Sequence, residues 1–516
     1  MKATVRVQTD RLIAQASDLL RGHFIEHVHG CMEGGIVDEE SSLVDQQGVR
    51  TDVRDYFREL KPGILRYPGG NFSCDYDWRQ GVLPRDQRPR RYNYGTRTTE
   101  SYRFGTHEFI DYCRQTGAEP MLTVNAGNGS ADLAADWVAY CNADGDNQWA
   151  AQRRANGYEK PFGVEYWAIG NEVYGDWVPG TKTGSEYGAF LKETVKNMKW
   201  SDEKIKIVGM ATGQWMPDWD RASIDATVDL VDYVSLHIYV GRQDYYNCVG
   251  SPVVIQKGID IVRGAIENAA SKKNLTRLPK IALDEYNVWY RTTHFPDRLD
   301  EQFNLQDALA LAGVQHVLFR NGNDVGMACI SMVVNVLGLI RANPKSAFRQ
   351  TIYWVMKMVA DYYTSEVVDC FVDCPSFNCR HPKYFAGVVE IDEEGREIET
   401  ESQKIAMMEY EGLPYLDVCT MYDKQRRRLV LSAVNRHKTQ AIDANILVLG
   451  SQLTGSLTGE TLTGKSVKTR NTFGSPDSVQ PTAVRKRSAS NEFNYRFPPH
   501  SFTVLSVGPE NPTRKK

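Results

Sequence analysis

The sequence predicts a (β/α)8 barrel followed by a C-terminal antiparallel β-sandwich. In the first part of the chain, eight short apolar runs alternate with longer stretches of helical periodicity, which is the pattern of a barrel built from strand–helix repeats. Beyond about residue 369 that periodicity fades, and strand-like runs separated by turn residues take its place. A chain of 516 residues is long enough for two such domains.

The barrel strands are expected at short apolar runs that turn residues bound on both sides. Helices are expected between them, and in the last of these helices Leu305, Leu309 and Ala312 recur near helical spacing. The predicted strands are residues 22–26, 64–67, 119–124, 165–169, 205–210, 233–238, 280–283 and 325–330, and the predicted helices include residues 105–116, 132–141, 184–199 and 305–320.

The second domain is expected to use both ends of the chain. Its strand-like runs are residues 428–434, 441–449 and 501–507, with glycine-containing turns between them. The first residues alternate like a strand and precede the barrel, so we expect them to pair into the sandwich. The predicted division is residues 1–18 with the sandwich, 19–368 for the barrel and 369–516 for the jelly-roll-like sandwich.

Composition gives no sign of a charged partner. The formal net charge is −4, so neither nucleic acid nor an anionic membrane is expected as a partner. No segment reaches the roughly 18 apolar residues of a membrane span, and the N-terminal residues lack an apolar stretch of signal-peptide length. We therefore expect a cytoplasmic protein with reduced thiols, since its ten cysteines are mostly scattered singly.

Two segments carry the chemistry, because each is an apolar run that ends in a carboxylate beside an amide. They are Gly170-Asn171-Glu172 after the fourth predicted strand and Asp284-Glu285-Tyr286-Asn287 after the seventh. Either alone is typical of a strand end and helix cap. Together they place Glu172 and Glu285 on the face where barrel chemistry occurs, as in the paired carboxylates of glycoside hydrolysis.

Other polar residues follow the predicted strands at the same face. Gly69 and Gly70 there let the backbone come close to a ligand. Taken singly, each polar residue fits a solvated loop or a satisfied core group, and their convergence at one barrel face favours a binding site. They are Glu26 after the first strand, Arg66 and Asn71 after the second, Asn171 after the fourth, and His237 and Tyr239 after the sixth.

Two further patterns compete with this interpretation. Residues 459–466 fit the P-loop expression, but the stretch before them is polar and Gly474-Ser475-Pro476 after them opposes a helix, so we reject phosphate binding. Cys370, Cys374 and Cys379, with His381 nearby, suggest zinc, but their spacing lacks the usual paired motif, which favours structural or incidental cysteines. No metal and no organic cofactor is expected.

The ordered set of segments resembles the α-L-arabinofuranosidases of glycoside hydrolase family 51 over nearly the whole chain. The residues that carry the resemblance are 22–27, 65–72, 105–109, 170–172, 237–239 and 284–290, with residues 471–473, Pro481 and 498–501 in the second domain. Residues 28–33 and the stretch near Cys370 depart from the family pattern.

The resemblance implies a retaining, exo-acting glycoside hydrolase that needs no cofactor and removes non-reducing-end α-L-arabinofuranose from oligosaccharides. It implies Glu172 as acid/base and Glu285 as nucleophile. Because two nearby carboxylates repel, we expect one glutamate to be held protonated near neutral pH and the other to stay ionised, which separates acid from nucleophile. It further implies a homo-oligomer, often a hexamer. The sugar-binding positions that carry over are Glu26, Arg66, Asn71, Asn171, His237 and Tyr239, together with a looser match at Gln350.

Three alternatives stay open at this point. One is hydrolysis of another furanoside, such as a galactofuranoside, and one is endo-β-glucanase action on the same barrel. The third is a non-catalytic carbohydrate-binding protein, which the presence of both Glu172 and Glu285 opposes. The products released from each substrate distinguish these activities.

Overall fold

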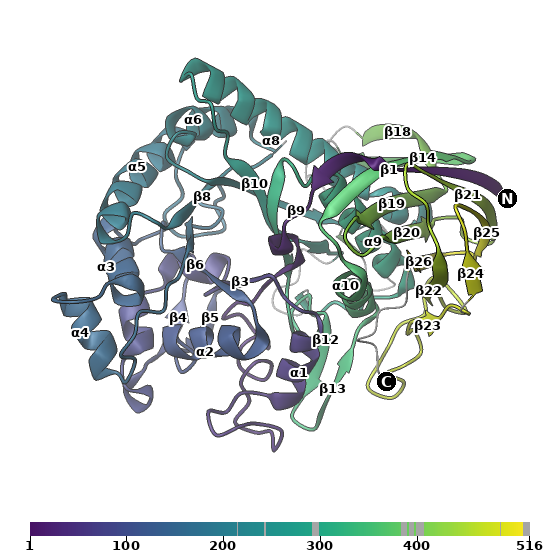
Figure 1. Cartoon of the computed structure of the whole chain (residues 1–516). Helices are drawn as coiled ribbons and strands as arrows, with labels where there is room; N and C mark the ends of the chain where they lie inside the picture. Colours follow the sequence, from purple (N-terminus) through teal and green to yellow (C-terminus); the bar gives the residue numbers. More distant parts are fainter. Residues whose placement is uncertain are drawn as a thin grey trace.

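The computed structural model describes residues 1–213, 215–241, 244–290, 299–382, 390–391, 397–398, 407–485 and 487–508. A closed barrel of eight parallel strands with helices around it forms one half of the molecule, and a ten-stranded sheet forms the other (Figure 1). The N-terminus lies on the side of the ten-stranded sheet. The predicted fold class is confirmed.

All eight predicted barrel strands are present, and each pairs in parallel with its neighbours until β11 closes the ring on β2. The largest difference from the prediction is in the seventh strand, which continues past residue 283 so that Asp284 and Glu285 lie within it. The strands are β2 (Gly22–Phe24), β3 (Ile64–Tyr67), β6 (Glu119–Val124), β7 (Tyr166–Ile169), β8 (Lys206–Met210), β9 (Tyr233–Val240), β10 (Lys280–Val288) and β11 (Val325–Ser331).

The helices surround the barrel, and the four predicted helices are confirmed. Capping boxes define two of the starts, with Thr183 and Glu186 opening α5 and Asn304 and Asp307 opening α9. The helices are α1 (Thr51–Glu59), α2 (Thr106–Thr116), α3 (Ala131–Asn142), α4 (Gln148–Ala155), α5 (Gly184–Ser201), α6 (Pro217–Thr227), α7 (Tyr245–Gly250), α8 (Pro252–Lys272), α9 (Leu305–Arg320) and α10 (Thr351–Tyr362), with 3-10 helices η1 (Asp18–Arg21), η2 (Asn71–Asp75), η3 (Trp78–Val82) and η4 (Arg85–Gln87).

The second domain is built on a sheet with the strand order β23-β22-β26-β20-β19-β14-β1-β21-β25, in which β24 also pairs with β22. The N-terminal strand β1 joins this sheet as predicted. It pairs antiparallel with β14 but parallel with β21, so the sheet is not wholly antiparallel. The strands are β1 (Lys2–Gln15), β14 (Glu366–Asp373), β19 (Leu416–Asp423), β20 (Arg428–Asn435), β21 (Ile442–Leu449), β22 (Gly455–Leu462), β23 (Thr482–Ala483), β24 (Arg487–Ala489), β25 (Glu492–Phe497) and β26 (Ser501–Gly508).

Two hydrophobic cores stabilise the two halves. Val5, Val7, Leu431 and Ile446 belong to a core of the second domain that is separate from the barrel core. The predicted boundaries at residues 18 and 368 stay predictions. Two-stranded ribbons complete the fold, namely β4 (Arg90–Asn93) with β5 (Thr98–Ser101), β12 (Ile340–Asn343) with β13 (Ser346–Arg349), β15 (Ser376–Pro382) with β18 (Met407–Pro414), and β16 (Glu390–Ile391) with β17 (Glu397–Ile398).

Helix α9 joins the halves through a buried ionic cluster centred on Asp417 of β19. His316 Nδ1 lies 3.0 Å from Asp417 Oδ2, and Arg436 Nη2 lies 2.6 Å from the same oxygen. Arg320 of α9 pairs with the other carboxylate oxygen. One carboxylate therefore ties barrel side chains to the sheet.

The competing motifs fall in places that do not support their alternative functions. The first part of the P-loop lookalike lies in strand β22, and residues 463–485 after that strand contain no helix. Cys370 lies in β14 and Cys379 in β15. Within the described part of the chain, the cysteine thiols form no group of three converging metal-ligand atoms.

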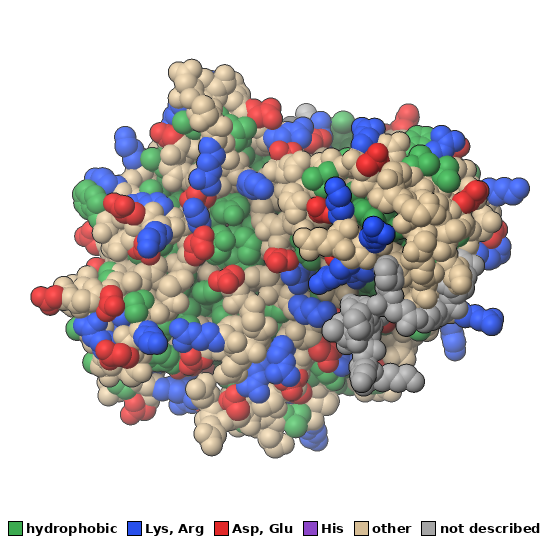
Figure 2. Space-filling model, viewed as in Figure 1, with side chains coloured by type: hydrophobic (Ala, Val, Ile, Leu, Met, Phe, Trp, Pro, Cys, Tyr) green, Lys and Arg blue, Asp and Glu red, His purple; other side chains and the backbone are tan. Residues whose placement is uncertain are grey.

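On the face drawn in Figure 2, basic and acidic side chains are interspersed over both halves. Among the helices that the structure describes, none combines the length and the apolar character of a membrane span.

Candidate active site

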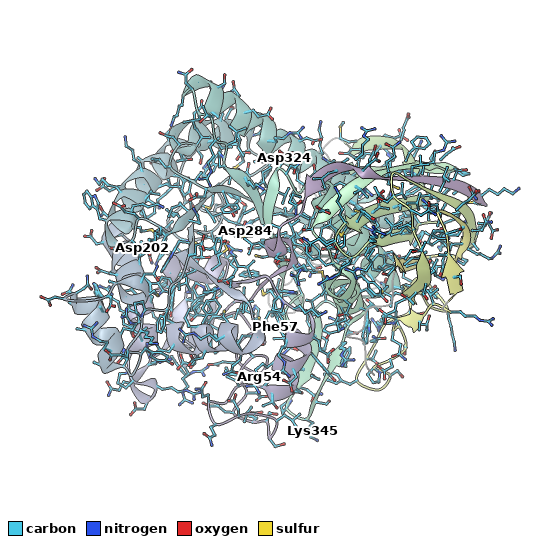
Figure 3. The ribbon with its side chains drawn as sticks, in the orientation of Figure 1. Arg54, Phe57, Asp202, Asp284, Asp324 and Lys345 are labelled. Atoms are coloured by element: carbon cyan, nitrogen blue, oxygen red, sulfur yellow. The ribbon has the colours of Figure 1, made fainter. Side chains whose placement is uncertain are left out.

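Four of the predicted site residues form one hydrogen-bonded chain inside the barrel. Arg66 Nη1 donates to Glu285 Oε2 at 2.8 Å, and Arg66 Nη2 donates to Asn171 Oδ1 at 2.6 Å. Asn171 Nδ2 in turn donates to Asn71 Oδ1 at 3.2 Å. Asp284, the residue before Glu285, marks this place within the ring of strands in Figure 3.

Glu285 is held by a hydrogen bond on each oxygen. Tyr239 Oη donates to Oε1 at 2.7 Å, while Arg66 occupies Oε2. The register between β9 and β10 shifts between Ala282 and Glu285, which inserts one extra residue into β10. Such a bulge re-aims side chains. It accounts for consecutive carboxylates, Asp284 and Glu285, both reaching Arg66.

Glu172 lies opposite, just after β7, in an unusual backbone conformation. Its φ is +44°, a left-handed value that a non-glycine residue rarely adopts. Its Oε1 contacts His237 Nδ1 at 2.9 Å, and Trp177 Nε1 donates to its Oε2 at 2.7 Å. Gly170 precedes it with φ of +84°, where a Cβ would lie 2.4 Å from Ala126 Cβ.

His237 lies between three carboxylates and carries a proton. Its Nδ1 is 3.6 Å from Glu285 Oε2, and its Nε2 is 3.5 Å from Asp284 Oδ1, in addition to the contact with Glu172. Burial alone would lower the pKa of His237, but the charge of Glu285 and bonds to Asp284 and Glu172 raise it to about 10. The imidazolium is therefore the stable form at neutral pH.

The pKa of Glu172 is held below its ordinary value in the unliganded site. Burial would raise the pKa of Glu172, but the hydrogen bond and positive charge of His237, helped by Trp177 and Arg66, lower it. Glu172 Oε1 and His237 Nδ1 lie 2.9 Å apart, within reach of direct proton transfer. Transfer along that contact gives the acid form of Glu172 without uptake from solvent.

The same side chains include the one group in the described part of the chain whose ligand atoms converge as for a metal, namely Glu172, His237 and Glu285. Both oxygens of each glutamate take part in hydrogen bonds, with Arg66 and Tyr239 on Glu285 and with His237 and Trp177 on Glu172. The donor set therefore suits hydrogen bonding and proton transfer.

Glu26 lies after β2 and is buried against the loop that follows β3. Its Oε1 accepts the Phe72 N–H at 2.9 Å. Burial raises the pKa of Glu26 to about 8 in spite of this bond, so the carboxyl is protonated at neutral pH and can donate. Gly69 has φ of +152°, and a Cβ there would lie 2.3 Å from Glu26 Cγ, so this approach requires glycine.

Gln350 differs from the other predicted residues, because its side chain binds backbone groups of neighbouring loops. Its Nε2 donates to the carbonyls of Gly338 at 2.8 Å and Glu301 at 3.1 Å, and its Oε1 accepts the Phe303 N–H at 3.0 Å. Through these hydrogen bonds, the Gln350 side chain holds the neighbouring loops together. Its contact with a sugar stays a prediction.

Two residues of the site were missed by sequence reasoning. Asp284 accepts a hydrogen bond from the Ser235 hydroxyl at 2.5 Å and contacts Arg66 Nε at 3.6 Å. Its position in the sequence beside Glu285 was the one sign that it belongs to the site. Trp177, five residues after Glu172, gives no signal in the sequence. Its ring stacks on Trp215 with centroids 5.0 Å apart, which supports its bond to Glu172.

The spacing of the two glutamates defines what they can do. An oxygen of Glu172 and an oxygen of Glu285 lie within 4.8 Å of each other. Retaining glycosidases place their carboxyl groups about 5–5.5 Å apart, whereas inverting enzymes leave about 6.5–9.5 Å for a water. Two facing carboxylates at this spacing, at the strand ends of a (β/α)8 barrel, are typical of a glycoside hydrolase.

Comparison with known proteins agrees with this class. The family models that match are the α-L-arabinofuranosidase 1 domain over residues 56–250 and the α-L-arabinofuranosidase C-terminal domain over residues 284–501. α-L-Arabinofuranosidase C of Emericella nidulans is 31% identical over 97% of this chain and 96% of its own length. The intracellular exo-α-(1→5)-L-arabinofuranosidase 1 of Bacillus subtilis is 28% identical over 98% of this chain and 99% of its own.

Solved structures give the same answer. The α-L-arabinofuranosidase from Thermotoga maritima in complex with arabinose superimposes with a TM-score of 0.89 at 32% identity, covering 98% of this chain and all of that one. The family 51 enzyme from Thermotoga petrophila gives the same TM-score and identity. This chain belongs to the α-L-arabinofuranosidases of glycoside hydrolase family 51.

Proposed function

We propose that the protein is a retaining, exo-acting α-L-arabinofuranosidase that releases terminal arabinofuranose from arabino-oligosaccharides or arabinose-decorated hemicellulose fragments. The observation that carries the proposal is the approach of Glu172 and Glu285 to within 4.8 Å inside a barrel of this family. The names of the fungal and bacterial relatives support the substrate class.

In the first step, Glu285 attacks the anomeric carbon and the bond to the leaving oxygen breaks. Arg66 and Tyr239 fix the two oxygens of the nucleophile. Glu172 gives the leaving oxygen a proton, which reaches it from His237 Nδ1 across 2.9 Å. The product is a glycosyl ester on Glu285 and a free alcohol.

In the second step, water replaces the ester with retention of configuration. Glu172 removes a proton from the water, whose oxygen attacks the anomeric carbon, and the Glu285 carboxylate leaves to recover its bonds to Arg66 and Tyr239. The proton that Glu172 takes from the water replaces the one that the Glu172–His237 pair gave to the leaving group. The site is then ready for the next cycle without a cofactor.

Sugar hydroxyls would be bound by groups that the cluster holds in place. Asn171 is fixed through Arg66 and Asn71, which suits it to grip the 2-hydroxyl as charge develops. Glu26, as a protonated carboxyl, and Asn71 supply further polar groups on the same side. Since Glu26 and Glu285 are only 6% and 8% exposed, the cluster suits a single terminal ring and therefore exo action.

The cellular setting is part of the proposal. A cytoplasmic location is supported by the intracellular enzyme of Bacillus subtilis named above. A homo-oligomer, hexameric by the family resemblance, is proposed for the assembly. Light scattering coupled to size-exclusion chromatography tests it, and a monomer at assay concentration contradicts it.

The decisive test is release of the phenol from an aryl α-L-arabinofuranoside by wild type beside Glu285→Gln. We expect turnover by wild type and essentially none by the folded variant, because an amide cannot act as the nucleophile. Aryl galactofuranoside and β-glucan are assayed in parallel. If wild type turned over one of these and left the arabinofuranoside intact, the substrate assignment would be wrong, and binding without turnover would indicate a carbohydrate-binding protein.

A further inference from the structure

A buried thiol lies directly behind the acid/base segment and takes no part in the steps above. Cys74 lies in η2, and its side chain is 0% exposed. Its Sγ is 3.1 Å from the carbonyl oxygen of Asn171. Burial raises the pKa of the thiol to about 12, so Cys74 keeps its proton and donates the hydrogen bond.

The carbonyl that Cys74 holds belongs to the peptide bond between Asn171 and Glu172. The orientation of that peptide plane sets φ of Glu172, which is +44°. A non-glycine residue keeps such a value only when its surroundings impose it. The Asn171 side chain is fixed by Arg66 and Asn71, and its carbonyl is fixed by Cys74.

Cys74 is itself anchored, so it can impose this orientation. Its carbonyl accepts the Asn128 N–H at 3.2 Å. The neighbouring backbone is so close that a Cβ on Gly127 would lie 2.3 Å from the Cys74 oxygen. On the other side of Glu172, the Lys182 N–H donates to the Val173 carbonyl at 2.7 Å.

We propose that Cys74 is a positioning residue for acid/base catalysis, whose S–H bond to the Asn171 carbonyl holds Glu172 in its left-handed conformation facing His237. The inference rests on the proposed function, and it assigns no chemistry to the thiol. Without this donor the buried carbonyl is unsatisfied. The peptide can then turn, and the Glu172 carboxyl leaves its place while Glu285 on β10 is undisturbed.

The test compares Cys74→Ala and Cys74→Ser with Cys141→Ala, which removes another fully buried thiol, in α3. The measured quantity is kcat/KM for phenyl and 2,4-dinitrophenyl α-L-arabinofuranosides, since the phenyl group needs protonation to leave and the dinitrophenyl group does not. We expect Cys74→Ala to lose about tenfold or more on the phenyl substrate, within the roughly 10²–10⁴-fold that acid catalysis contributes. It should stay near wild type on the dinitrophenyl substrate, Cys74→Ser should recover most of the loss, and Cys141→Ala should match wild type on both.

Equal losses on the two substrates, or no loss at all, would overturn the inference. So would a Cys74→Ser variant that is as slow as Cys74→Ala. Should the alanine variant fail to fold, Cys74→Val fills the same space without a donor and gives the same comparison. Glu172→Ala is measured beside them: if it shows no leaving-group dependence, the proposed function fails, whereas dependence in Glu172→Ala alone rejects only the role of Cys74.

Discussion

Replacing His237 with Asn tests the idea that the catalytic proton is shared. The imidazolium is the partner of Glu172 at 2.9 Å and also faces Glu285 and Asp284. With it, three carboxylates face two cations, His237 and Arg66. Asparagine keeps a hydrogen-bond donor of similar size but removes one of the two positive charges.

The size of the effect follows from the contact distance. Opposite unit charges 2.9 Å apart interact by about 6 kcal/mol at an effective dielectric constant of about 20. In wild type, the shared proton leaves the pair as pH rises through the His237 pKa of about 10. In the variant, Glu172 must hold that proton alone. Since one pH unit corresponds to about 1.4 kcal/mol, loss of this interaction moves the basic limb of activity down by at least about one unit.

The assay is the pH dependence of kcat/KM on the phenyl arabinofuranoside, which depends on acid catalysis. A lower basic limb in His237→Asn is the expected outcome. Stability gives a second measurement, because a histidine whose folded pKa is raised contributes stability that is complete below about pH 6.5 and is lost as pH rises through about 10. Identical basic limbs in wild type and His237→Asn would refute the shared proton.

Two further predictions concern residues that sequence reasoning did not assign. Trp177→Phe keeps an aromatic ring but removes the donor to Glu172 Oε2. Because a hydrogen bond to a charged group contributes about 1.5–3 kcal/mol, kcat/KM on the phenyl substrate should fall roughly 10- to 100-fold. A wild-type rate in the variant would contradict a role for this bond. Asp417→Asn leaves Arg436 and Arg320 without their counter-charge, so urea denaturation should show a loss of about 3–5 kcal/mol in unfolding free energy. The pKa of Asp417 is held well below its usual range, so its contribution to the free energy of unfolding is present above the unfolded carboxyl pKa of about 4 and is lost as pH falls through the lower folded pKa. An unchanged urea midpoint in Asp417→Asn at neutral pH would show that the cluster does not stabilise the protein.

The barrel could be predicted from sequence because its signal is local. Each strand is a short apolar run and each helix has its own periodicity, so eight strands and four helices were found from the residues that form them. The pairing of β1 with β21 is different in kind. Paired residues of these two strands, such as Val5 and Ile446, are about 440 positions apart in the sequence. Neither segment contains a pattern that indicates parallel pairing with the other.

The site was predictable as far as strand ends reveal it. Glu172, Glu285, Arg66 and Asn171 follow or end apolar runs, and the structure brings them together. Trp177 comes from a loop position with no periodic signal. The bulge before Glu285 was hidden as well, because alternation in a regular strand would send Asp284 and Glu285 to opposite faces.

That bulge affects the electrostatics of the site. Because it turns Asp284 inward beside Glu285, His237 faces three carboxylates rather than two. The third carboxylate helps to raise the pKa of His237, and the positive charge of His237 in turn lowers the pKa of Glu172. Repulsion between the two glutamates would raise the pKa of Glu172, and the positive charge of His237 opposes that effect. The proposed acid, Glu172, is therefore paired with His237 at 2.9 Å, a contact that no spacing of carboxylates in the sequence reveals.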